Sequence, residues 1–506
     1  MRLRLLAIPL ALATFTISPA AFADDELAGV HGGLVYLRDK NDNVRLYLQG
    51  RAQIDQFNYF GPGVGDVASL KSTFLLRRIR PELTGEFLRT WQFSLAGDWG
   101  QTGNDNTAGT NETSAAAPGA TPTNATGRYA TAQTPTLRAQ PTDVWLAYAP
   151  TKVFRLQVGQ YDAPFMLENR TSDKYIQFME RSLAVRALGV PTNKEMGIMA
   201  YGETEDSLLY YSAGVFSGDG QNRVSPDSRA DVMGRVFVHP LHNMSGALKD
   251  LQIGASGRWG VRDAYYVGYD YPGMSTQGGY TFWKTTYGGS KGQTHILPSG
   301  TQMAIAGELR VPFDIIDFTG EFVYVNNHTR ESVEGFQLTN TERLGSLKGY
   351  GYYAQLGVWL FGPRDVNGLP GYENPASVNL KKPDPEKLPQ SLQLLVKWEQ
   401  LSTKYEGASR GGTADAKNVD GDIKINALSL GANWWASKHV RLTANYVLNM
   451  FPDSEPTSAT TAGGPTQTSS QRAIAPGNTV GKGINDSARD GAHVLHELLF
   501  RAAVAF

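Results

Sequence analysis

The sequence contains no cysteine among its 506 residues, and this absence removes several classes of protein. Disulfide-stabilised scaffolds, metal sites with thiolate ligands and thiol catalysis all require cysteine. A strong excess of charge of either sign is also missing, because 47 lysines and arginines face 48 aspartates and glutamates. A balanced charge gives no general attraction to nucleic acid, so we expect no nucleic-acid partner.

Long apolar runs are scarce as well. The mean hydropathy is −0.32. A membrane helix needs an apolar run of roughly 18 residues, and after the apolar run at the N-terminus the sequence contains no second run of that length. A bundle of membrane helices is therefore excluded. Glycine and aromatic residues are abundant, with 55 Gly, 23 Tyr, 21 Phe and 9 Trp. This composition is unlike that of a disordered chain and favours an all-β protein.

Residues 1–23 have the pattern of a secretory signal peptide. Arg2 and Arg4 precede an apolar stretch that ends at Ile17, and the segment closes on alanines, the last of them Ala23, before acidic residues. This order is typical of cleaved export signals, and the apolar stretch is short for the alternative, a retained anchor. Cleavage after Ala23 leaves 45 basic and 48 acidic residues, a net charge of −3. A large exported chain without cysteine fits the envelope of a Gram-negative bacterium.

Apolar residues recur at every second position in many segments, which is the period of a β-strand. In the last segment Leu498, Phe500 and Val504 share one face, whereas Glu497 and Arg501 share the other. We identify sixteen such segments, at 45–55, 75–87, 91–99, 141–149, 152–160, 194–202, 207–217, 229–239, 249–260, 300–312, 315–327, 349–361, 390–402, 423–435, 438–450 and 490–506. An even number is what bacterial single-chain membrane barrels require.

The connections between these segments alternate between long and short. The long ones are 56–74, 100–140, 161–193, 218–228, 261–299, 328–348, 403–422 and 451–489, and the proline-rich link 362–389 is an exception among the short ones. A soluble sandwich has no reason to collect its long loops at one end, whereas an outer-membrane barrel has long external loops and short periplasmic turns.

The sequence therefore predicts an all-β fold, a transmembrane antiparallel β-barrel of about sixteen strands. After the signal peptide at 1–23 we expect a short N-terminal segment at 24–44 and a single barrel over 45–506. In such a barrel the apolar face meets lipid and the polar face lines the interior. Sixteen strands enclose a lumen too wide for side chains alone to fill, which indicates a pore.

Several segments resemble the phosphate-selective porin O and P family. They are Leu76-Arg-Arg-Ile-Arg-Pro-Glu-Leu-Thr-Gly-Glu-Phe87, Trp91-Gln-Phe-Ser-Leu95, Val158-Gly-Gln-Tyr-Asp-Ala-Pro-Phe165, Thr171-Ser-Asp-Lys-Tyr-Ile-Gln-Phe-Met-Glu-Arg-Ser-Leu183, Gly351-Tyr-Tyr-Ala-Gln-Leu356, Leu430-Gly-Ala-Asn-Trp-Trp-Ala436 and Ala444-Asn-Tyr-Val447. The resemblance covers most of the chain from about Gly32 to Phe506. It implies a sixteen-stranded barrel, a homotrimer, and a third long loop (about 161–193) that folds into the pore.

The resemblance also implies that basic residues in the pore guide phosphate. The matching positions are Arg51 on the first strand, Arg77 and Arg78 near the start of the second, and Arg181 in the third loop. Arginine suits this role because its planar guanidinium presents paired donors to an oxyanion and stays charged at physiological pH.

Two departures from the family pattern bear on selectivity. The family's lysine at the constriction falls on Asn169, with Arg170 beside it as a substitute. The fifth long loop lacks the family's series of arginines, since it is rich in glycine and tyrosine and only Arg258 and Arg262 flank its start. Phosphate selectivity does not follow from the resemblance alone, and the tyrosines leave organic solutes or sugars as an alternative.

The same basic residues have a purely structural interpretation. Arg80 and its neighbours on the second strand could pair with Glu82 and Glu86, and Arg181 with Glu180 could fasten the third loop to the barrel.

We therefore expect an outer-membrane porin for passive diffusion of small hydrophilic solutes, with an anion bias and a possible preference for phosphate or polyphosphate. Its site residues would be Arg51, Arg77, Arg78, Arg170 and Arg181. Alternatives are a non-selective or sugar porin, or a non-conducting structural or adhesive barrel. No catalytic group, cofactor or metal is expected. The G-x-S-x-G match at Gly288 to Gly292 lacks the strand and helix that such a motif needs. The expected partners are permeating anions, outer-membrane lipid, lipopolysaccharide and two further copies of the chain.

Overall fold

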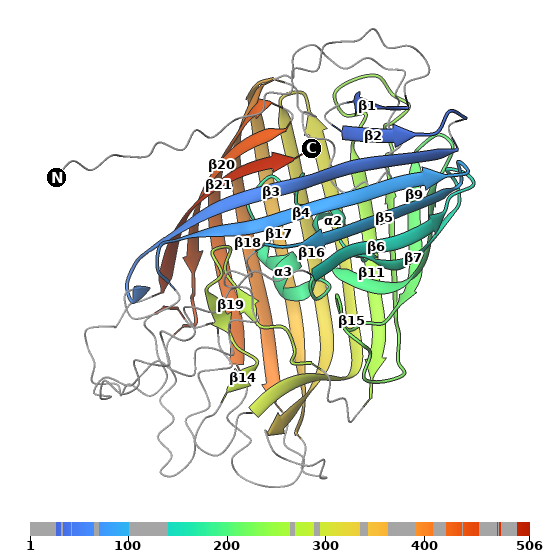
Figure 1. Ribbon diagram of the computed structural model, residues 1–506. Helices are drawn as coiled ribbons and strands as arrows, with labels where there is room; N and C mark the ends of the chain where they lie inside the picture. Colours follow the sequence, from blue (N-terminus) through green and yellow to red (C-terminus); the bar gives the residue numbers. More distant parts are fainter. Residues whose placement is uncertain are drawn as a thin grey trace, which may run out of the picture.

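The computed structural model describes residues 27–31, 34–41, 43–64, 70–100, 140–263, 269–287, 294–333, 343–362, 390–407, 421–437, 439–454, 473, 475–476 and 493–505. Within these residues sixteen long strands form one antiparallel wall (Figure 1). They are β3 (Val44–Phe60), β4 (Thr73–Phe87), β5 (Trp91–Asp98), β6 (Gln140–Tyr148), β7 (Arg155–Asp162), β8 (Lys194–Glu203), β9 (Leu209–Phe216), β10 (Asp231–Val238), β11 (Gln252–Arg262), β15 (Thr294–Phe313), β16 (Ile316–Val333), β17 (Arg343–Phe361), β18 (Ser391–Gly407), β19 (Gly421–Ser437), β20 (Val440–Met450) and β21 (Val494–Ala505). Each of the sixteen predicted segments overlaps one of them, which confirms the predicted fold class.

The wall closes into a barrel because the last strand pairs with the first of the sixteen. β21 runs antiparallel to β3, with Arg501 opposite Asp55. Every other strand of the barrel pairs with its neighbours in sequence order, as in β15 with β16 and β16 with β17. Closure gives both the first and the last strand of the barrel a partner, and a closed barrel is what a membrane requires.

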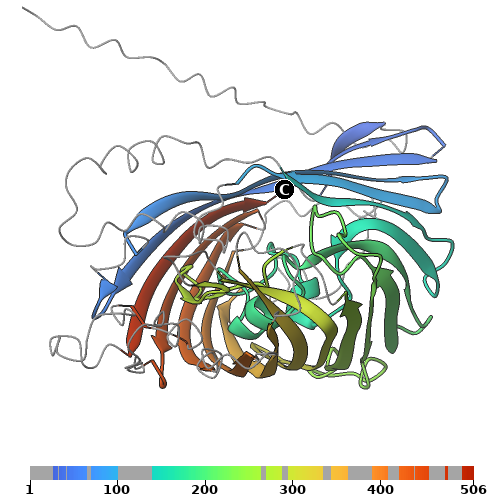
Figure 2. The ribbon, with the colours of Figure 1, turned by 90° about the horizontal axis from the view of Figure 1, so that it is seen from below.

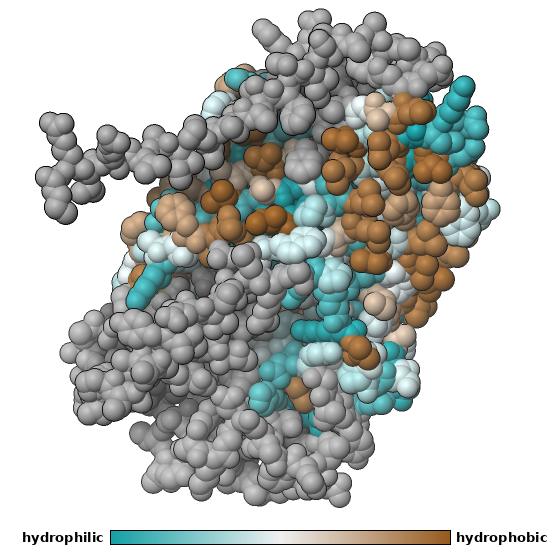
Figure 3. Space-filling view, viewed as in Figure 1, coloured by the Kyte–Doolittle hydropathy of each residue, from teal (hydrophilic) through white to brown (hydrophobic). Residues whose placement is uncertain are grey.

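The outer surface is apolar because alternate residues of each strand face outward. On β18, Leu394, Val396 and Trp398 are exposed, whereas the intervening Lys397 and Glu399 are fully buried inside. Figure 3 shows hydrophobic side chains gathered over strands β3 to β7 on the face in view. Lipid is the solvent that this pattern suits. None of the helices in the described part of the chain is long and apolar enough to cross a bilayer.

The connections confirm the predicted asymmetry. At one end β4 and β5 are joined by residues 88–90, where Leu88 and Arg89 take positive φ, and β15 and β16 are joined by two residues, of which Asp314 has positive φ. The third loop, residues 163–193, leaves the wall at the other end, between β7 and β8. The exceptional link between β17 and β18 falls largely on residues 363–389, outside the described part of the chain.

Two strands precede the barrel in the segment where the sequence suggested none. β1 (Ala28–His31) pairs with β2 (Leu34–Arg38), and β2 pairs with β3 from Arg45 to Leu48. β21 pairs with β3 only from Arg51 onward. The β1–β2 hairpin therefore pairs with the first part of β3, and β21 pairs with the rest of β3.

Two loops occupy the barrel interior. The third loop, residues 163–193, contains the short helices α2 (Leu167–Arg170) and α3 (Leu183–Leu188), which Figure 2 shows within the ring of strands. The fifth loop contributes the hairpin β12 (Met274–Ser275) and β13 (Thr281–Trp283), and β14 (Thr286–Tyr287) pairs with β15. Between β12 and β13, the Gly278 amide reaches Glu497 on β21, on the opposite side of the barrel.

The interior is partly apolar, unlike the uniformly polar face that the sequence suggested. Packed against the two inward loops are wall side chains that are fully buried: Val323, Val325, Leu347, Leu401, Ile423, Ile425, Val447 and Leu495. From the hairpin, Met274, Phe282 and Trp283 join the same cluster. Alternation therefore predicts which residues face inward, but the loops decide whether that surface is wet.

Candidate functional site

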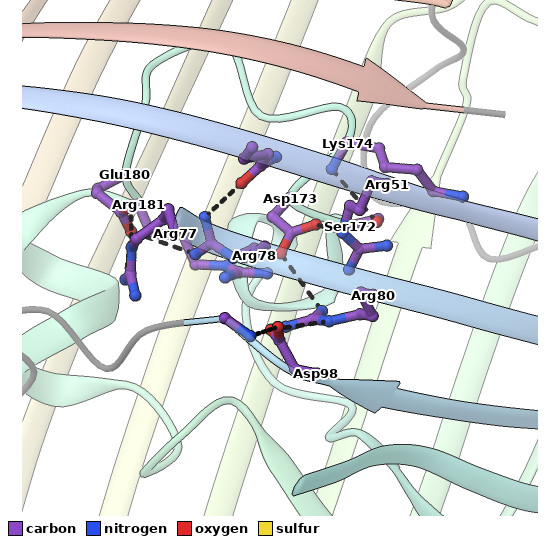
Figure 4. Close-up of polar contacts among 12 residues, drawn as sticks. Arg51, Arg77, Arg78, Arg80, Asp98, Ser172, Asp173, Lys174, Glu180 and Arg181 are labelled. Atoms are coloured by element: carbon purple, nitrogen blue, oxygen red, sulfur yellow. Dashed lines mark hydrogen bonds and ion pairs between the residues drawn. The ribbon is translucent and has the colours of Figure 1, made fainter. Parts of the chain in front are cut away.

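A β-bulge turns two consecutive arginines toward the barrel interior. On β3, Gln53 pairs with Arg78 while the next residue, Ile54, pairs with Leu76, so Arg77 is the extra residue of β4. Consecutive residues of a regular strand point to opposite faces, and a bulge re-aims the side chain at the extra position. Both guanidinium groups consequently reach the third loop (Figure 4).

Four adjacent strands, β20, β21, β3 and β4, supply a cluster of arginines that we call the arginine wall. It consists of Arg51, Arg77, Arg78, Arg80, Arg441 and Arg501. All are at most partly exposed, with Arg77 the most accessible in its ion pairs at 15% side-chain exposure. Buried cations require partners, and the third loop provides two of them.

Asp173 of the third loop lies among three guanidinium groups. Its carboxylate oxygens are 2.5 Å from Arg51 Nε, 2.7 Å from Arg78 Nε and 3.3 Å from a terminal nitrogen of Arg80. Burial alone would raise the pKa of this carboxyl, but Arg51, Arg80 and Arg78 hold its pKa well below the ordinary value. Asp173 is therefore ionised at physiological pH.

Glu180 lies among a second set of three. Its carboxylate oxygens are 3.0 Å from Arg77 Nε, 3.4 Å from Arg78 Nη2 and 3.0 Å from Arg501 Nη2. Burial opposes ionisation here as well, yet Arg77, Arg78 and Arg501 hold the pKa of Glu180 well below its ordinary value. Two carboxylates of one loop thus fasten it to the arginine wall.

Strands β16 and β18 hold the third loop by a different chemistry. Glu321 on β16 accepts hydrogen bonds from the amides of Leu167 and Glu168 at the start of α2, at 2.7 and 2.8 Å. Glu399 on β18 accepts one from the amide of Leu183 at the start of α3, at 2.6 Å. Unpaired amides at a helix start favour a negative partner. The loop therefore spans the lumen between a basic wall and acidic groups.

Wall residues on β19 and β20 support the middle of the loop. The Asn433 side chain donates to the carbonyl of Gln177 at 2.7 Å, and the amide of Met179 donates to the Asn445 side chain at 2.8 Å. These contacts fix the height at which Glu180 meets the arginines.

The structure brings three of the five predicted site residues together and places the other two within the loop. Arg51, Arg77 and Arg78 contact Asp173 or Glu180, as described. Arg181 donates to the carbonyls of Glu168 and Thr171 at 3.0 and 2.8 Å. The loop is fastened to the wall through Glu180, and Arg181 braces the loop from within.

Arg170 lies at the base of the third loop, where it donates to the carbonyl of Asp162. Asn169, at the position of the family lysine, donates to the carbonyls of Ala163 and Asn193 at 3.2 Å each and so bridges the two ends of the loop. Lys194 Nζ adds an ion pair with Asp162 at 2.9 Å.

Sequence reasoning missed several members of this site. Asp173, Arg441 and Arg501 were not among the predicted residues, and Arg80 pairs with Asp98 at 2.6 Å in place of Glu82 or Glu86. Arg441 and Arg501 both occupy the polar face of their strands, which is the signal that could have placed them inside. No pattern along the chain connects Asp173 to its three arginines.

The fifth loop uses its basic and aromatic residues for packing. Arg262 forms an ion pair with Asp231 at 2.6 Å, and Arg258 donates to the carbonyl of Gly189 at 3.4 Å. The rings of Tyr271 and Trp283 are in edge contact at 6.2 Å between centroids. In the described part of the chain no group of three or more His, Asp or Glu side chains is arranged to hold a metal ion.

Comparison with known proteins gives consistent matches. The family described as phosphate-selective porin O and P matches residues 46–471. Porin O of Pseudomonas aeruginosa is 23% identical over 318 residues, which span 60% of this chain and 66% of that protein, just under two thirds of its length. A loop-deletion form of OmpT, an outer-membrane protein of Vibrio cholerae, has a TM-score of 0.47 at 9% identity, over 92% of this chain and 100% of that one. An anion-selective porin from Comamonas acidovorans has a TM-score of 0.42 at 11% identity, over 92% of this chain and 100% of that one.

Proposed function

Since the chain belongs to the phosphate-selective porin O and P family of outer-membrane porins, which are channels and not enzymes, we propose that it conducts small hydrophilic solutes by passive diffusion with a preference for anions. The arginine wall carries this proposal. Its six arginines face four carboxylates in direct ion-pair contact, Asp55, Asp98, Asp173 and Glu180, which leaves a local excess of positive charge.

The mechanism is electrostatic. An anion that leaves bulk water loses hydration, and fixed positive charge lowers that barrier, while several weak sites allow it to move on. Within the predicted set, Arg77 and Arg78 are the residues we assign to solute contact, with Arg51 beside them. We assign Arg170 and Arg181 to shaping the third loop.

Phosphate or polyphosphate is the finer form of this proposal, supported by the family match and by the bidentate geometry that arginine offers to oxyanions. For the sugar alternative, Tyr271 and Trp283 of the described part of the fifth loop offer no free ring face, because they pack against each other and are buried. A non-conducting barrel would show no channel activity.

A reversal potential measured in a planar bilayer across a tenfold gradient of KCl tests the function. We expect the sign that corresponds to chloride preference, and addition of inorganic phosphate to reduce the chloride current. A potassium preference would overturn the proposed anion bias, and an absence of conductance would favour the structural barrel.

We further propose that residues 1–23 are a cleaved export signal and that three copies of the chain assemble in the outer membrane, in contact with lipid and lipopolysaccharide. Family membership supports the assembly, and the basic, apolar and small-residue order supports the signal. N-terminal sequencing and cross-linking of the purified protein test these two statements.

A further inference from the structure

Each acidic residue of the third loop that reaches the arginine wall occupies a site formed by three guanidinium groups. Arg51, Arg78 and Arg80 surround Asp173 within 3.3 Å. Arg77, Arg78 and Arg501 surround Glu180 within 3.4 Å. We call these the Asp173 seat and the Glu180 seat; they share Arg78. Several guanidinium groups converging on one pair of oxygens is the arrangement by which proteins hold carboxylates and phosphates.

Neither seat is neutralised by its resident carboxylate. At the Asp173 seat, Asp98 contributes a second negative charge through Arg80, at 2.6 Å. At the Glu180 seat, Asp55 contributes one through Arg501, at 2.7 Å. Because the seats share Arg78, five arginines face four carboxylates across the two seats together, which leaves one positive charge in excess. A dianion would neutralise this excess more fully than the single charge of a carboxylate does.

The third loop has attachments besides these two carboxylates. The helix starts are held by Glu321 on β16 and Glu399 on β18, and its middle is held by Asn433 and Asn445. The two carboxylates therefore fasten the loop together with other contacts, and at the same time they occupy the arginines as a bound anion would.

We propose that the third loop inhibits oxyanion binding at the two seats with its own carboxylates, Asp173 and Glu180. A permeating oxyanion binds by exchange, because each arginine that releases Asp173 or Glu180 gains an equivalent partner at once. The Glu180 seat is the more accessible, with 15% side-chain exposure at Arg77 and 10% at Glu180 against 3% at Asp173. This inference deepens the proposed function and rests on it.

The test is block of the chloride current by inorganic phosphate, measured on single channels of the full-length protein and of its Asp173→Asn and Glu180→Gln variants. Each substitution removes a competing charge while it retains the shape of the side chain. We expect the half-blocking phosphate concentration to fall by about tenfold or more in each variant, the factor that a hydrogen bond to a charged group provides. Acetate in a parallel series distinguishes carboxylate solutes from phosphate.

Matched variants isolate the effect. Glu205→Gln removes the same charge from an exposed turn and should leave the half-blocking concentration unchanged. Arg80→Gln added to Asp173→Asn removes part of the vacated seat and should reverse the gain. Heat-dependent electrophoretic mobility verifies that every variant forms the folded barrel.

Unchanged phosphate block in both Asp173→Asn and Glu180→Gln, in channels that still prefer chloride, would overturn this inference and leave the proposed function standing. A potassium preference of the wild-type channel would overturn the proposed function, and this inference with it.

Discussion

Replacing Arg77 by glutamine tests whether the arginine wall sets the preference for anions. Arg77 is the extra residue of the bulge on β4, and with 15% side-chain exposure it has more contact with the lumen than its neighbours in the ion-pair cluster. It forms an ion pair with Glu180, at 3.0 Å. The substitution removes one positive charge and leaves Glu180 with Arg78 and Arg501 as partners.

The magnitude follows from Coulomb's law. At about 6 Å in water, a unit charge changes the energy of a monovalent ion by about 0.7 kcal/mol. A Debye length of about 10 Å at 0.1 M salt reduces this to about 0.4 kcal/mol. Anion and cation shift in opposite directions, so the two barriers separate by about 0.8 kcal/mol. The ratio of chloride to potassium permeability should therefore fall about fourfold.

The reversal potential in a KCl gradient measures this ratio directly. Glu180→Gln, which removes the opposing charge, should raise the ratio by a similar factor. Arg89→Gln is the matched control, because Arg89 is exposed in the turn after β4. It follows Arg78 by eleven residues, which corresponds to about 35 Å along an extended strand. Equal ratios in wild type, Arg77→Gln and Glu180→Gln would refute the assignment of the arginine wall to the conducting path.

Three further predictions concern the stability and pH response of the same interior. Arg501→Gln leaves the fully buried Asp55 without its bidentate partner at the seam of β21 and β3, so the unfolding free energy in guanidinium should fall by about 3–5 kcal/mol; a loss below about 1 kcal/mol would show the pair to be unimportant. Trp283→Ala removes a side chain of the fifth-loop hairpin that is 1% exposed, at an expected cost of about 3–5 kcal/mol in the same assay. Because the pKa of Asp173 is depressed, its contribution to stability is present above its unfolded pKa of about 3.9 and is lost only as pH falls through the lower folded value. The difference in permeability ratio between wild type and Asp173→Asn should accordingly be the same at pH 7 and pH 5, and a difference that vanishes at pH 5 would contradict the depressed pKa.

The strands of this barrel were predictable from the sequence because a two-residue period is imposed by the pleat itself. Each residue that faces lipid must be apolar, and this requirement acts on every strand independently of its neighbours. The extra hairpin of β1 and β2 was not predictable in this way. Leu34–Arg38 is a short segment, and its pairing with β3 depends on where β21 ends.

The candidate site was predictable only in part, and the bulge at Arg77 shows why. Strict alternation would send Arg77 and Arg78 to opposite faces, and a shift of one residue in register reverses every side chain beyond it. Only the pairing of Ile54 with Leu76 and of Gln53 with Arg78 brings both arginines inside. The resemblance to the family identified Arg77 and Arg78, and the strand pairing explains how both side chains can face the interior.

The partners of those arginines were beyond reach for a different reason. Asp173 meets Arg51 across more than a hundred residues of sequence, and Glu180 meets Arg501 across 321 residues. The path of the third loop decides these contacts, and that path is fixed by wall residues such as Glu399 and Asn445. Each of these looks, in the sequence, like any other polar residue on the inner face of a strand.

The net charge of the chain and the net charge of the arginine wall with its four contacting carboxylates have opposite signs, and this contrast constrains how selectivity can arise. The exported chain carries 45 basic and 48 acidic residues, so its overall field repels anions weakly. Charges more than about a Debye length from the conducting path are screened, so the groups that decide selectivity are those within about 10 Å of it. There the six arginines of the wall exceed the four carboxylates that contact them. Two of those carboxylates, Asp173 and Glu180, belong to the third loop and not to the barrel, so a shift of that loop changes the local charge without changing the sequence of the wall. Selectivity in this protein should therefore depend on the position of the third loop as much as on the number of arginines.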